Sequence, residues 1–227
     1  MKIGILQTGH APDEVQDQLG DYDAMFGRLL ADEGFVFETF NVVDMAFPQS
    51  VTACDGWLVT GSKHGAYEDH AFIPPLEVFI RAARDNDVPM VGICFGHQII
   101  AQALGGRVEK FAGGWAVGRQ TYDWDGHEIA LNAWHQDQVV DLPAGAQTVA
   151  HNDFCAHAAV VYDRAAFTVQ PHPEFGDTMI DGLAKLRGVG VVPDPLLARV
   201  QDNLGKPNAN QKLAAMIAQF FRERRIA

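Results

Sequence analysis

The sequence predicts an α/β fold built on a doubly wound, mixed but mainly parallel sheet that is flanked by helices. Two observations lead to this prediction. Short apolar runs alternate with segments of helical periodicity over residues 1–106, which is the pattern of parallel strands joined by crossover helices. The run at 88–102 then connects an apolar strand to a helix through a sharp turn at Cys94, and the letters G-I-C-F-G around this turn have the spacing of a nucleophile elbow.

Chain length limits the domain organisation. The 227 residues are enough for one α/β domain with a sizeable core. We therefore expect a single domain over 1–227, with a core over about 1–177 and a helical extension over about 178–227. No internal repeat or domain linker interrupts this pattern.

Charge and cysteine content limit the partners and the compartment. A formal net charge of −12 argues against nucleic acid or an anionic membrane surface as a partner. No apolar run approaches the ~20 residues of a membrane span, and the chain does not begin with a signal-peptide pattern. The three cysteines lack metal-type spacing, which fits a reducing compartment, so we expect a cytoplasmic location.

The part of the chain that precedes Cys94 predicts strands and helices in alternation. Apolar residues recur at helical spacing in two segments, and the shorter apolar runs between them fit buried strands. In chain order the expected elements are a strand at Lys2–Thr8, a polar loop at Gly9–Gly20, a helix at Tyr22–Leu30, strands at Phe35–Val42 and Trp57–Thr60, a helix at Pro74–Asp87, the strand Met90–Ile93 and a helix from about His97.

From Arg107 onward, short strand-like segments follow one another without clear helices, so we expect antiparallel or mixed strands that extend the same sheet. Asp125-Gly126 is a hairpin turn signal between two of them. The tail predicts a docking helix with an apolar stripe. The expected strands are Arg107–Phe111, Arg119–Trp124, Glu128–Leu131, Thr148–His151, Ala158–Tyr162 and Ala166–Gln170, and the stripe is Leu213, Ile217, Phe220 and Phe221.

Cys94 is the strongest candidate for a catalytic residue. A nucleophile that projects from a strand-to-helix turn needs small neighbours, which Gly92 and Gly96 provide. The free N–H groups at the start of the following helix favour a thiolate. The alternative is a buried cysteine that packs as a small hydrophobe, and the two flanking glycines favour the nucleophile.

A cysteine nucleophile needs a base, and the base needs a group that orients it. His172 and Glu174 follow a strand-like run in the segment Q-P-H-P-E-F. Residues two apart in extended backbone share a side, so the carboxylate can support the imidazole. Taken alone, this pair fits a structural or metal-binding histidine about as well, and the upstream cysteine favours the catalytic interpretation.

An acyl-transfer site also needs donors for an oxyanion. The N–H of Phe95 and the loop Gly61-Ser62 at the end of a neighbouring strand are placed to supply them, although a plain glycine turn explains the loop equally well by itself. The segment Trp134–Gln138 either lines a substrate pocket or is a solvated turn. The remaining histidines form no evident metal constellation, so we expect neither a metal nor a cofactor.

These motifs resemble the class I (triad) glutamine amidotransferases. G-I-C-F-G-H-Q at Gly92–Gln98 and H-P-E at His172–Glu174 are similar to the two main signatures of that family, and the resemblance extends from the first strand to about Phe175. It implies that Cys94 is the nucleophile, His172 the base and Glu174 the residue that orients the base.

The resemblance also implies roles around the triad. It implies that Gln98 helps to hold the substrate, and that Phe95, Gly61 and Ser62 form the oxyanion hole, although this loop reads Gly-Ser-Lys where synthetase-linked relatives carry Gly-Gly-Pro. The segment Trp134–Asp137 is more similar to the γ-glutamyl peptidase branch than to the amidotransferase half of GMP synthase, which makes His135 a possible pocket residue.

Three functions follow as expectations from the resemblance. The first is a free-standing hydrolase that cleaves a γ-glutamyl amide bond, in glutamine or in a γ-glutamyl peptide or conjugate, through a γ-glutamyl thioester on Cys94. The second is a glutaminase subunit that delivers ammonia to a separate synthase. The third is a catalytically silent binding module, against which the intact Cys94, His172 and Glu174 argue. A cysteine hydrolase with a dienelactone-type site is a more remote alternative.

Overall fold

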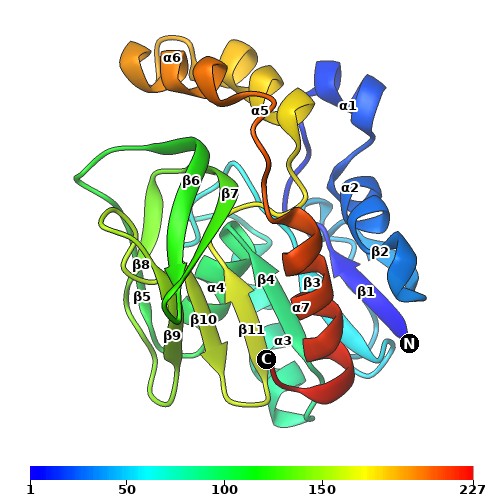
Figure 1. Cartoon of the computed structure of the whole chain (residues 1–227). Helices are drawn as coiled ribbons and strands as arrows, with labels where there is room; N and C mark the ends of the chain where they lie inside the picture. Colours follow the sequence, from blue (N-terminus) through cyan, green and yellow to red (C-terminus); the bar gives the residue numbers. More distant parts are fainter. Residues whose placement is uncertain (227) are drawn as a thin grey trace.

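A nine-stranded sheet forms the centre of the computed structural model, which describes residues 1–226 (Figure 1). Its strand order is β2-β1-β3-β4-β11-β10-β9-β6-β7. The first five strands in this order are parallel to one another: β2 (Val36–Phe40), β1 (Lys2–Leu6), β3 (Gly56–Val59), β4 (Met90–Ile93) and β11 (Ala166–Val169). The next four continue the sheet in antiparallel pairing: β10 (Ala159–Tyr162), β9 (Gln147–His151), β6 (Ala116–Trp124) and β7 (His127–His135). The mixed, mainly parallel α/β fold class is thereby confirmed.

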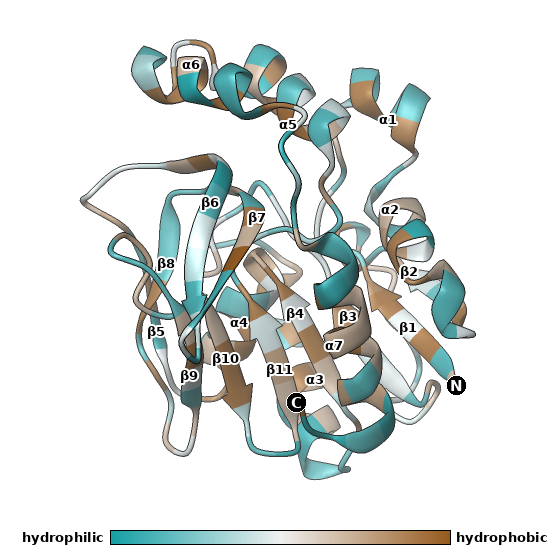
Figure 2. Cartoon of the chain, in the orientation of Figure 1, coloured by the Kyte–Doolittle hydropathy of each residue, from teal (hydrophilic) through white to brown (hydrophobic). Residues whose placement is uncertain are grey.

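Helices cover both faces of the parallel strands. Alternate strand residues point to opposite faces, so Ile3 and Ile5 contribute to one apolar cluster and Leu6 to another. One face packs against α2 (Tyr22–Leu29) and α7 (Asn210–Glu223), and the other against α3 (Ile73–Asp85) and α4 (Phe95–Ala103). Figure 2 shows that the central strands are mainly hydrophobic, whereas the outward surface of α7 is hydrophilic. The predicted stripe on α7 is buried.

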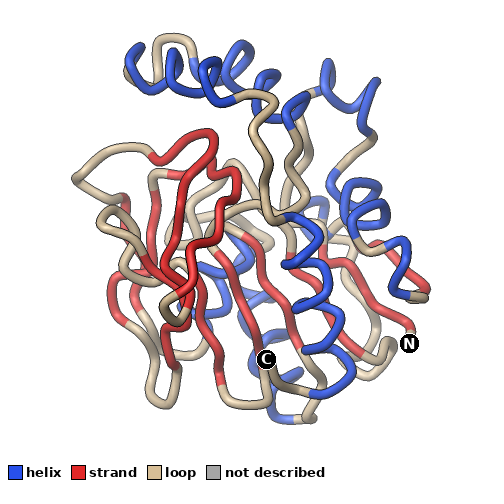
Figure 3. Tube along the Cα trace, in the orientation of Figure 1, coloured by secondary structure: helices blue, strands red, loops and turns tan. Residues whose placement is uncertain are grey.

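Further helices form a separate layer beyond the carboxyl ends of the parallel strands (Figure 3). This layer holds α1 (Asp13–Leu19), α5 (Asp177–Leu183), the π-helical turn η3 (Ala184–Gly188) and α6 (Asp194–Asn203). Two short 3-10 turns, η1 (Ala31–Glu33) and η2 (Val42–Asp44), complete the helical elements. Within residues 1–226, no helix combines the length and the apolar character that crossing a membrane requires.

Three local predictions were wrong. The expected polar loop at 9–20 contains α1, a short helix that buries only Val15 and therefore carries no apolar periodicity. The helix after the elbow begins at Phe95, directly after Cys94, rather than at His97. The strand β5 (Arg107–Lys110) does not extend the main sheet, because it pairs with β8 (Asp137–Asp141) in a separate two-stranded sheet.

The two glycines of the elbow allow β4, α4 and β3 to pack in contact. A Cβ on Gly92 would lie 2.4 Å from the carbonyl oxygen of Gly96, and a Cβ on Gly96 would lie 2.1 Å from the carbonyl oxygen of Val59. The N–H of Gly96 also donates to the carbonyl of Thr60 at 3.0 Å. The helix therefore sits directly on the end of β3, which brings the loop after β3 next to Cys94.

Gly96→Ala is expected to destabilise the fold by about 3 kcal/mol, because the new methyl group would overlap a backbone carbonyl that is itself held in the sheet. Gly27→Ala is the matched control. Gly27 lies inside α2 with nothing within 4 Å of its Cβ position, so alanine there should raise the free energy of unfolding by about 0.5 kcal/mol. Equilibrium denaturation measures both, and equal stability of the two variants would contradict this packing.

Candidate active site

Cys94 occupies the strained turn that the sequence predicts. Its φ of 53° and ψ of −104° lie outside the regions that a non-glycine residue usually adopts. Two backbone hydrogen bonds hold this conformation: the N–H of Cys94 donates to the carbonyl of Val169 at 2.9 Å, and its carbonyl accepts from the N–H of Gln98 at 3.0 Å. Strain that surrounding contacts maintain in this way is typical of functional sites.

His172 is held on three sides. The backbone N–H of His172 donates to the carbonyl of Asn132 at 2.8 Å. The imidazole ring stacks on Phe175 at a centroid distance of 3.9 Å and an angle of 4°. Its Nδ1 lies 2.7 Å from Glu174 Oε1. The other ring nitrogen remains for the sulfur of Cys94, which lines the same pocket as His172. The structure thus brings the three predicted residues together at one site, and their roles as a triad remain a prediction.

The backbone that pairs His172 with Glu174 differs from the predicted one. The sequence predicts extended backbone with both side chains on one side, whereas residues 173–174 form a turn in which the N–H of Phe175 donates to the carbonyl of His172 at 3.3 Å. The predicted contact exists, but the turn and the Phe175 ring produce it rather than strand alternation.

Burial makes the Glu174 charge act on the imidazole. The Glu174 side chain is fully buried, and its Oε2 has no hydrogen-bond partner among the described residues. Burial alone would lower the pKa of His172, but the charges of Glu174 and of a Cys94 thiolate, with hydrogen bonds to both, raise it to about 10. The imidazole is therefore positively charged at neutral pH when the sulfur is a thiolate.

The raised pKa of His172 also makes folding stability depend on pH. The stabilisation that the charged imidazole contributes is complete below the ordinary histidine pKa of 6.5 and is lost as the pH rises through about 10.

The loop after β3 approaches the cysteine and the histidine through its backbone. A Cβ on Gly61 would lie 2.9 Å from His172 Cε1 and 3.7 Å from Cys94 Cβ, so only glycine fits without displacing the imidazole. Thr8 Oγ1 donates to the carbonyl of Gly61 at 3.1 Å and fixes the loop. Phe95 is the first residue of α4, so its N–H has no acceptor inside the helix. The geometry is consistent with the predicted oxyanion donors, whose role remains a prediction.

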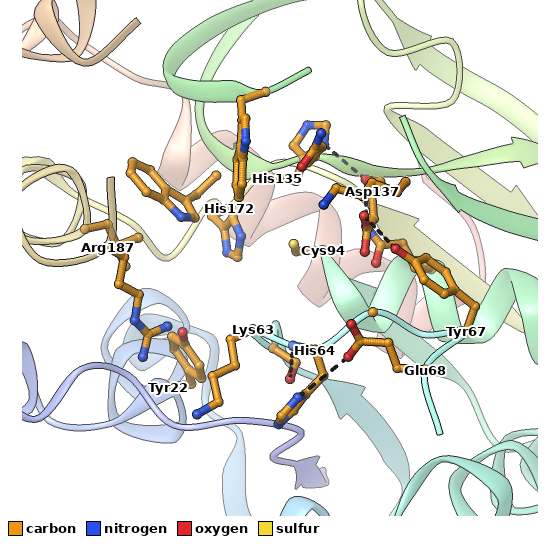
Figure 4. Close-up of a pocket in the computed structure, with 18 of the residues that line it drawn as sticks. Tyr22, Lys63, His64, Tyr67, Glu68, Cys94, His135, Asp137, His172 and Arg187 are labelled. Atoms are coloured by element: carbon orange, nitrogen blue, oxygen red, sulfur yellow. Dashed lines mark hydrogen bonds and ion pairs between the residues drawn. The ribbon is translucent and has the colours of Figure 1, made fainter. Parts of the chain in front are cut away.

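A pocket of about 270 Å³ opens over Cys94 (Figure 4). Charged and aromatic side chains surround the pocket in two groups. Figure 4 places the first group, Tyr67, Glu68 and Asp137, on one side of Cys94, and the second group, Tyr22 and Arg187, on the side where His172 lies, with Lys63 below. The pocket therefore has an acidic end, where Lys110 of β5 lies opposite Asp137, and a basic end, with the sulfur between them.

The junction of β7 and β8 forms part of the acidic end, together with Tyr67 and Glu68 from the loop after β3. The sequence predicts either a pocket wall or a solvated turn for this segment, and His135 and Asp137 both line the pocket. Gln98 Nε2 donates to the carbonyl of Asp137 at 2.9 Å and to Gln170 Oε1 at 3.1 Å. Both amide hydrogens of Gln98 are thus used within the protein, which leaves only its oxygen for a substrate. The predicted substrate contact of Gln98 therefore remains a prediction, and its visible task is to position Asp137.

His135 is a neutral member of the same wall. Its Nδ1 lies 3.2 Å from the carbonyl of Asp137, which requires the proton to be on Nδ1. Burial lowers the pKa of His135 to about 3. Its Nε2 is buried without a partner among the described residues, so this nitrogen can accept a hydrogen bond.

Sequence reasoning missed the basic end of the pocket. Lys63 belongs to the predicted glycine loop, but nothing in the sequence connects it with Arg187, which lies more than a hundred residues away on η3. Arg187 Nη2 makes one long contact, 3.4 Å, with the carbonyl of His10, so most of its hydrogen-bonding capacity faces the pocket or solvent.

The fold and this arrangement define the class of protein. The chain belongs to the class I glutamine amidotransferases: the model of the family Glutamine amidotransferase class-I matches residues 24–182, a range that contains Cys94, His172 and Glu174.

Individual relatives include a gamma-glutamyl peptidase and a GMP synthase component. Gamma-glutamyl peptidase 4 of Arabidopsis thaliana is 29% identical over 222 residues, which are 90% of this chain and 88% of that protein. A glutamine-hydrolysing GMP synthase component of Halobacterium salinarum is 33% identical over 174 residues, which are 72% of this chain and 89% of that protein. The crystal structure of a glutamine amidotransferase from Methylobacillus flagellatus has a TM-score of 0.74 at 22% identity, over 99% of this chain and 92% of that one.

Proposed function

We propose that this protein hydrolyses γ-glutamyl amide bonds through a thioester on Cys94, and that it prefers γ-glutamyl peptides or conjugates to free glutamine. The observation that carries the proposal is a pocket that extends to both sides of Cys94. The similarity to a gamma-glutamyl peptidase over most of both chains supports it. The wider family membership supports an enzyme but does not distinguish between the two substrates.

The proposed reaction has two halves. The thiolate of Cys94 attacks the γ-carbonyl carbon, an S–C bond forms, and the N–H groups of Phe95 and the Gly61-Ser62 loop stabilise the oxyanion. As the C–N bond breaks, His172 gives its proton to the leaving amine. A water molecule then attacks the thioester carbon and gives a proton to His172, and the S–C bond breaks to release glutamate and the thiolate.

The two ends of the pocket suit the two halves of such a substrate. His172 must protonate the leaving nitrogen, so the leaving amine occupies the side on which His172 and Arg187 lie. A cation there favours an amine that carries a carboxylate, such as the second residue of a γ-glutamyl dipeptide. Asp137, at the opposite end, suits the α-ammonium group of the glutamyl half. Ammonia, the leaving group of glutamine, would make no use of Arg187.

Arg187→Gln is therefore expected to lower kcat/KM by about tenfold for a γ-glutamyl dipeptide, because a charge-assisted contact to the carboxylate is lost. For a γ-glutamyl alkylamide, whose leaving amine has no carboxylate, kcat/KM should change by less than about twofold. Arg84→Gln is a matched control on the exposed surface of α3. Equal losses with both substrates would contradict a carboxylate contact at Arg187.

Glutamate release by the purified chain, from glutamine and from a γ-glutamyl dipeptide in parallel, tests the function itself. The proposal predicts a higher kcat/KM for the dipeptide and no release by Cys94→Ala. Higher activity on glutamine would favour the second candidate, a glutaminase that serves a separate synthase, which the similarity to the Halobacterium GMP synthase component supports. No release from either substrate would contradict the hydrolase and favour a module that needs a partner or only binds.

A further inference from the structure

A cluster of metal-ligating side chains lies at the rim of the pocket, on the loop between β3 and α3. His64, Glu68 and His70 each offer one ligand atom, and these three atoms lie within 4.8 Å of one another. Glu68 Oε2 is 2.8 Å from His70 Nε2 and 3.9 Å from His64 Nδ1. We propose that these three residues form a binding site for a divalent transition-metal ion such as Zn²⁺. The sequence did not indicate it, because the residues lie on a loop and not at helical spacing on one face.

The distances and the donor types suit such an ion. Zinc binds histidine nitrogen and carboxylate oxygen at about 2.0–2.2 Å, which separates neighbouring ligands of a tetrahedron by about 3.3–3.5 Å. The two separations that involve Glu68, 2.8 and 3.9 Å, bracket this value, and all three ligand atoms lie within 4.8 Å of one another, so small side-chain rotations would complete the geometry. Two imidazoles with one carboxylate form a known three-ligand zinc set, with a fourth position left for water. Imidazole ligands also favour zinc over magnesium or calcium.

Packing holds the two imidazoles in place before any ion arrives. The rings of His64 and His70 lie 4.0 Å apart between centroids. Both contact the buried ring of Phe72, at 5.8 and 5.9 Å, and Phe72 in turn packs against the fully buried Phe95. This aromatic support lowers the entropic cost of ordering the ligands.

The cluster is open to solvent and close to the catalytic loop. The exposed fractions of the His64, Glu68 and His70 side chains are 21%, 46% and 33%, so an ion can reach them. His64 and Glu68 also line the pocket, and Figure 4 shows that they point toward one another there. Lys63 adds a neighbouring positive charge that opposes the binding of a cation. The negative charge of the Glu68 carboxylate offsets this repulsion. The site follows Gly61-Ser62 in the same loop, and the inference does not depend on the proposed function.

Calorimetric titration with ZnCl₂ tests the site directly. The parent protein is the full chain with Cys94→Ala, because Cys94 and His172 are a thiol and imidazole pair that also attracts zinc. We expect one Zn²⁺ per chain and no binding of Mg²⁺. His70→Ala and Glu68→Gln should each weaken Zn²⁺ binding by at least about tenfold, whereas His127→Ala, at an exposed histidine outside the pocket, should leave it unchanged.

Thermal unfolding provides a second readout and controls for folding. Substitution of His70 should leave the unfolding midpoint without metal nearly unchanged. Zn²⁺ should raise the midpoint of the parent, since an ion that binds only the folded state stabilises it, and this rise should be lost in His70→Ala. Unchanged Zn²⁺ affinity in His70→Ala and Glu68→Gln, or no saturable binding by the parent, would overturn the proposal.

Discussion

Cys94→Ala is expected to lower the rate of glutamate release by at least about 10⁴-fold, because the sulfur forms the covalent intermediate and no neighbouring group can replace it. The change removes one atom from a residue whose backbone conformation is held by hydrogen bonds to Val169 and Gln98. The free energy of unfolding should therefore change by less than about 2 kcal/mol. Steady-state kinetics and denaturant unfolding on the same preparation measure both quantities.

Cys94→Ser is the companion to this experiment. Serine keeps the size and the hydrogen-bonding capacity of the side chain but forms an anion far less readily than a thiol does. We expect a loss of the same order as for alanine, with the fold unchanged. Activity near the wild-type value in either variant would contradict the assignment of Cys94 as the nucleophile.

His172→Ala is expected to have the second-largest effect, a loss of about 10⁴-fold in kcat, since the leaving amine then has no proton donor. Glu174→Gln should lower kcat by a smaller factor, about 10²-fold smaller than the factor for His172→Ala, because Glu174 acts only through the imidazole. If Glu174→Gln proved the more damaging of the two, the roles of base and orienting residue would be misassigned.

A pH profile distinguishes these roles from a merely structural effect. In the wild type, the imidazolium has a pKa of about 10, so the alkaline limb of kcat/KM should lie near that pH. Glu174→Gln removes the buried negative charge that favours the imidazolium, so the limb should move to lower pH. An alkaline limb that stays in place would show that Glu174 does not set the charge of His172.

The elbow was predictable because local constraints fix it. Two glycines around a cysteine at a strand-to-helix junction favour a sharp turn, and the close contacts at Gly92 and Gly96 show why no larger residue fits. The parallel strands β1 and β3 were predictable for a similar reason, since each is a short, mainly buried run between turn signals. The edge strand β2 is largely exposed, and its alternation with helices predicts it instead. The contact of His172 with Glu174 was also predictable, although the turn that achieves it was not.

The errors arise where pairing is non-local or where the signal is weak. β5 and β8 pair with each other across more than twenty intervening residues, and β5 buries only Val108, so nothing local distinguishes it from a strand of the main sheet. α1 buries only Val15, and its sequence therefore predicts a loop. Each segment needs a partner that the sequence does not specify.

The missing parts of the site follow the same logic. Arg187 reaches the pocket from η3, and its approach to Cys94 depends on how the helical layer folds back over the strand ends. The cluster of His64, Glu68 and His70 depends on turns within one irregular loop. The two motifs identify Cys94, His172 and Glu174, but no motif includes Arg187 or the cluster of His64, Glu68 and His70.

Labelling with a glutamine-like electrophile shows directly whether Cys94 is the nucleophile that attacks the substrate. The reagent carries the α-amino-acid group of glutamine and a reactive carbon in place of the carboxamide, and peptide mass spectrometry locates the site of attachment. We expect one label per chain on Cys94, slower labelling when a γ-glutamyl dipeptide is present, and slower labelling in His172→Ala. Glutamate release that continues while Cys94 stays unlabelled, or labelling that the dipeptide does not slow, would contradict this role of Cys94.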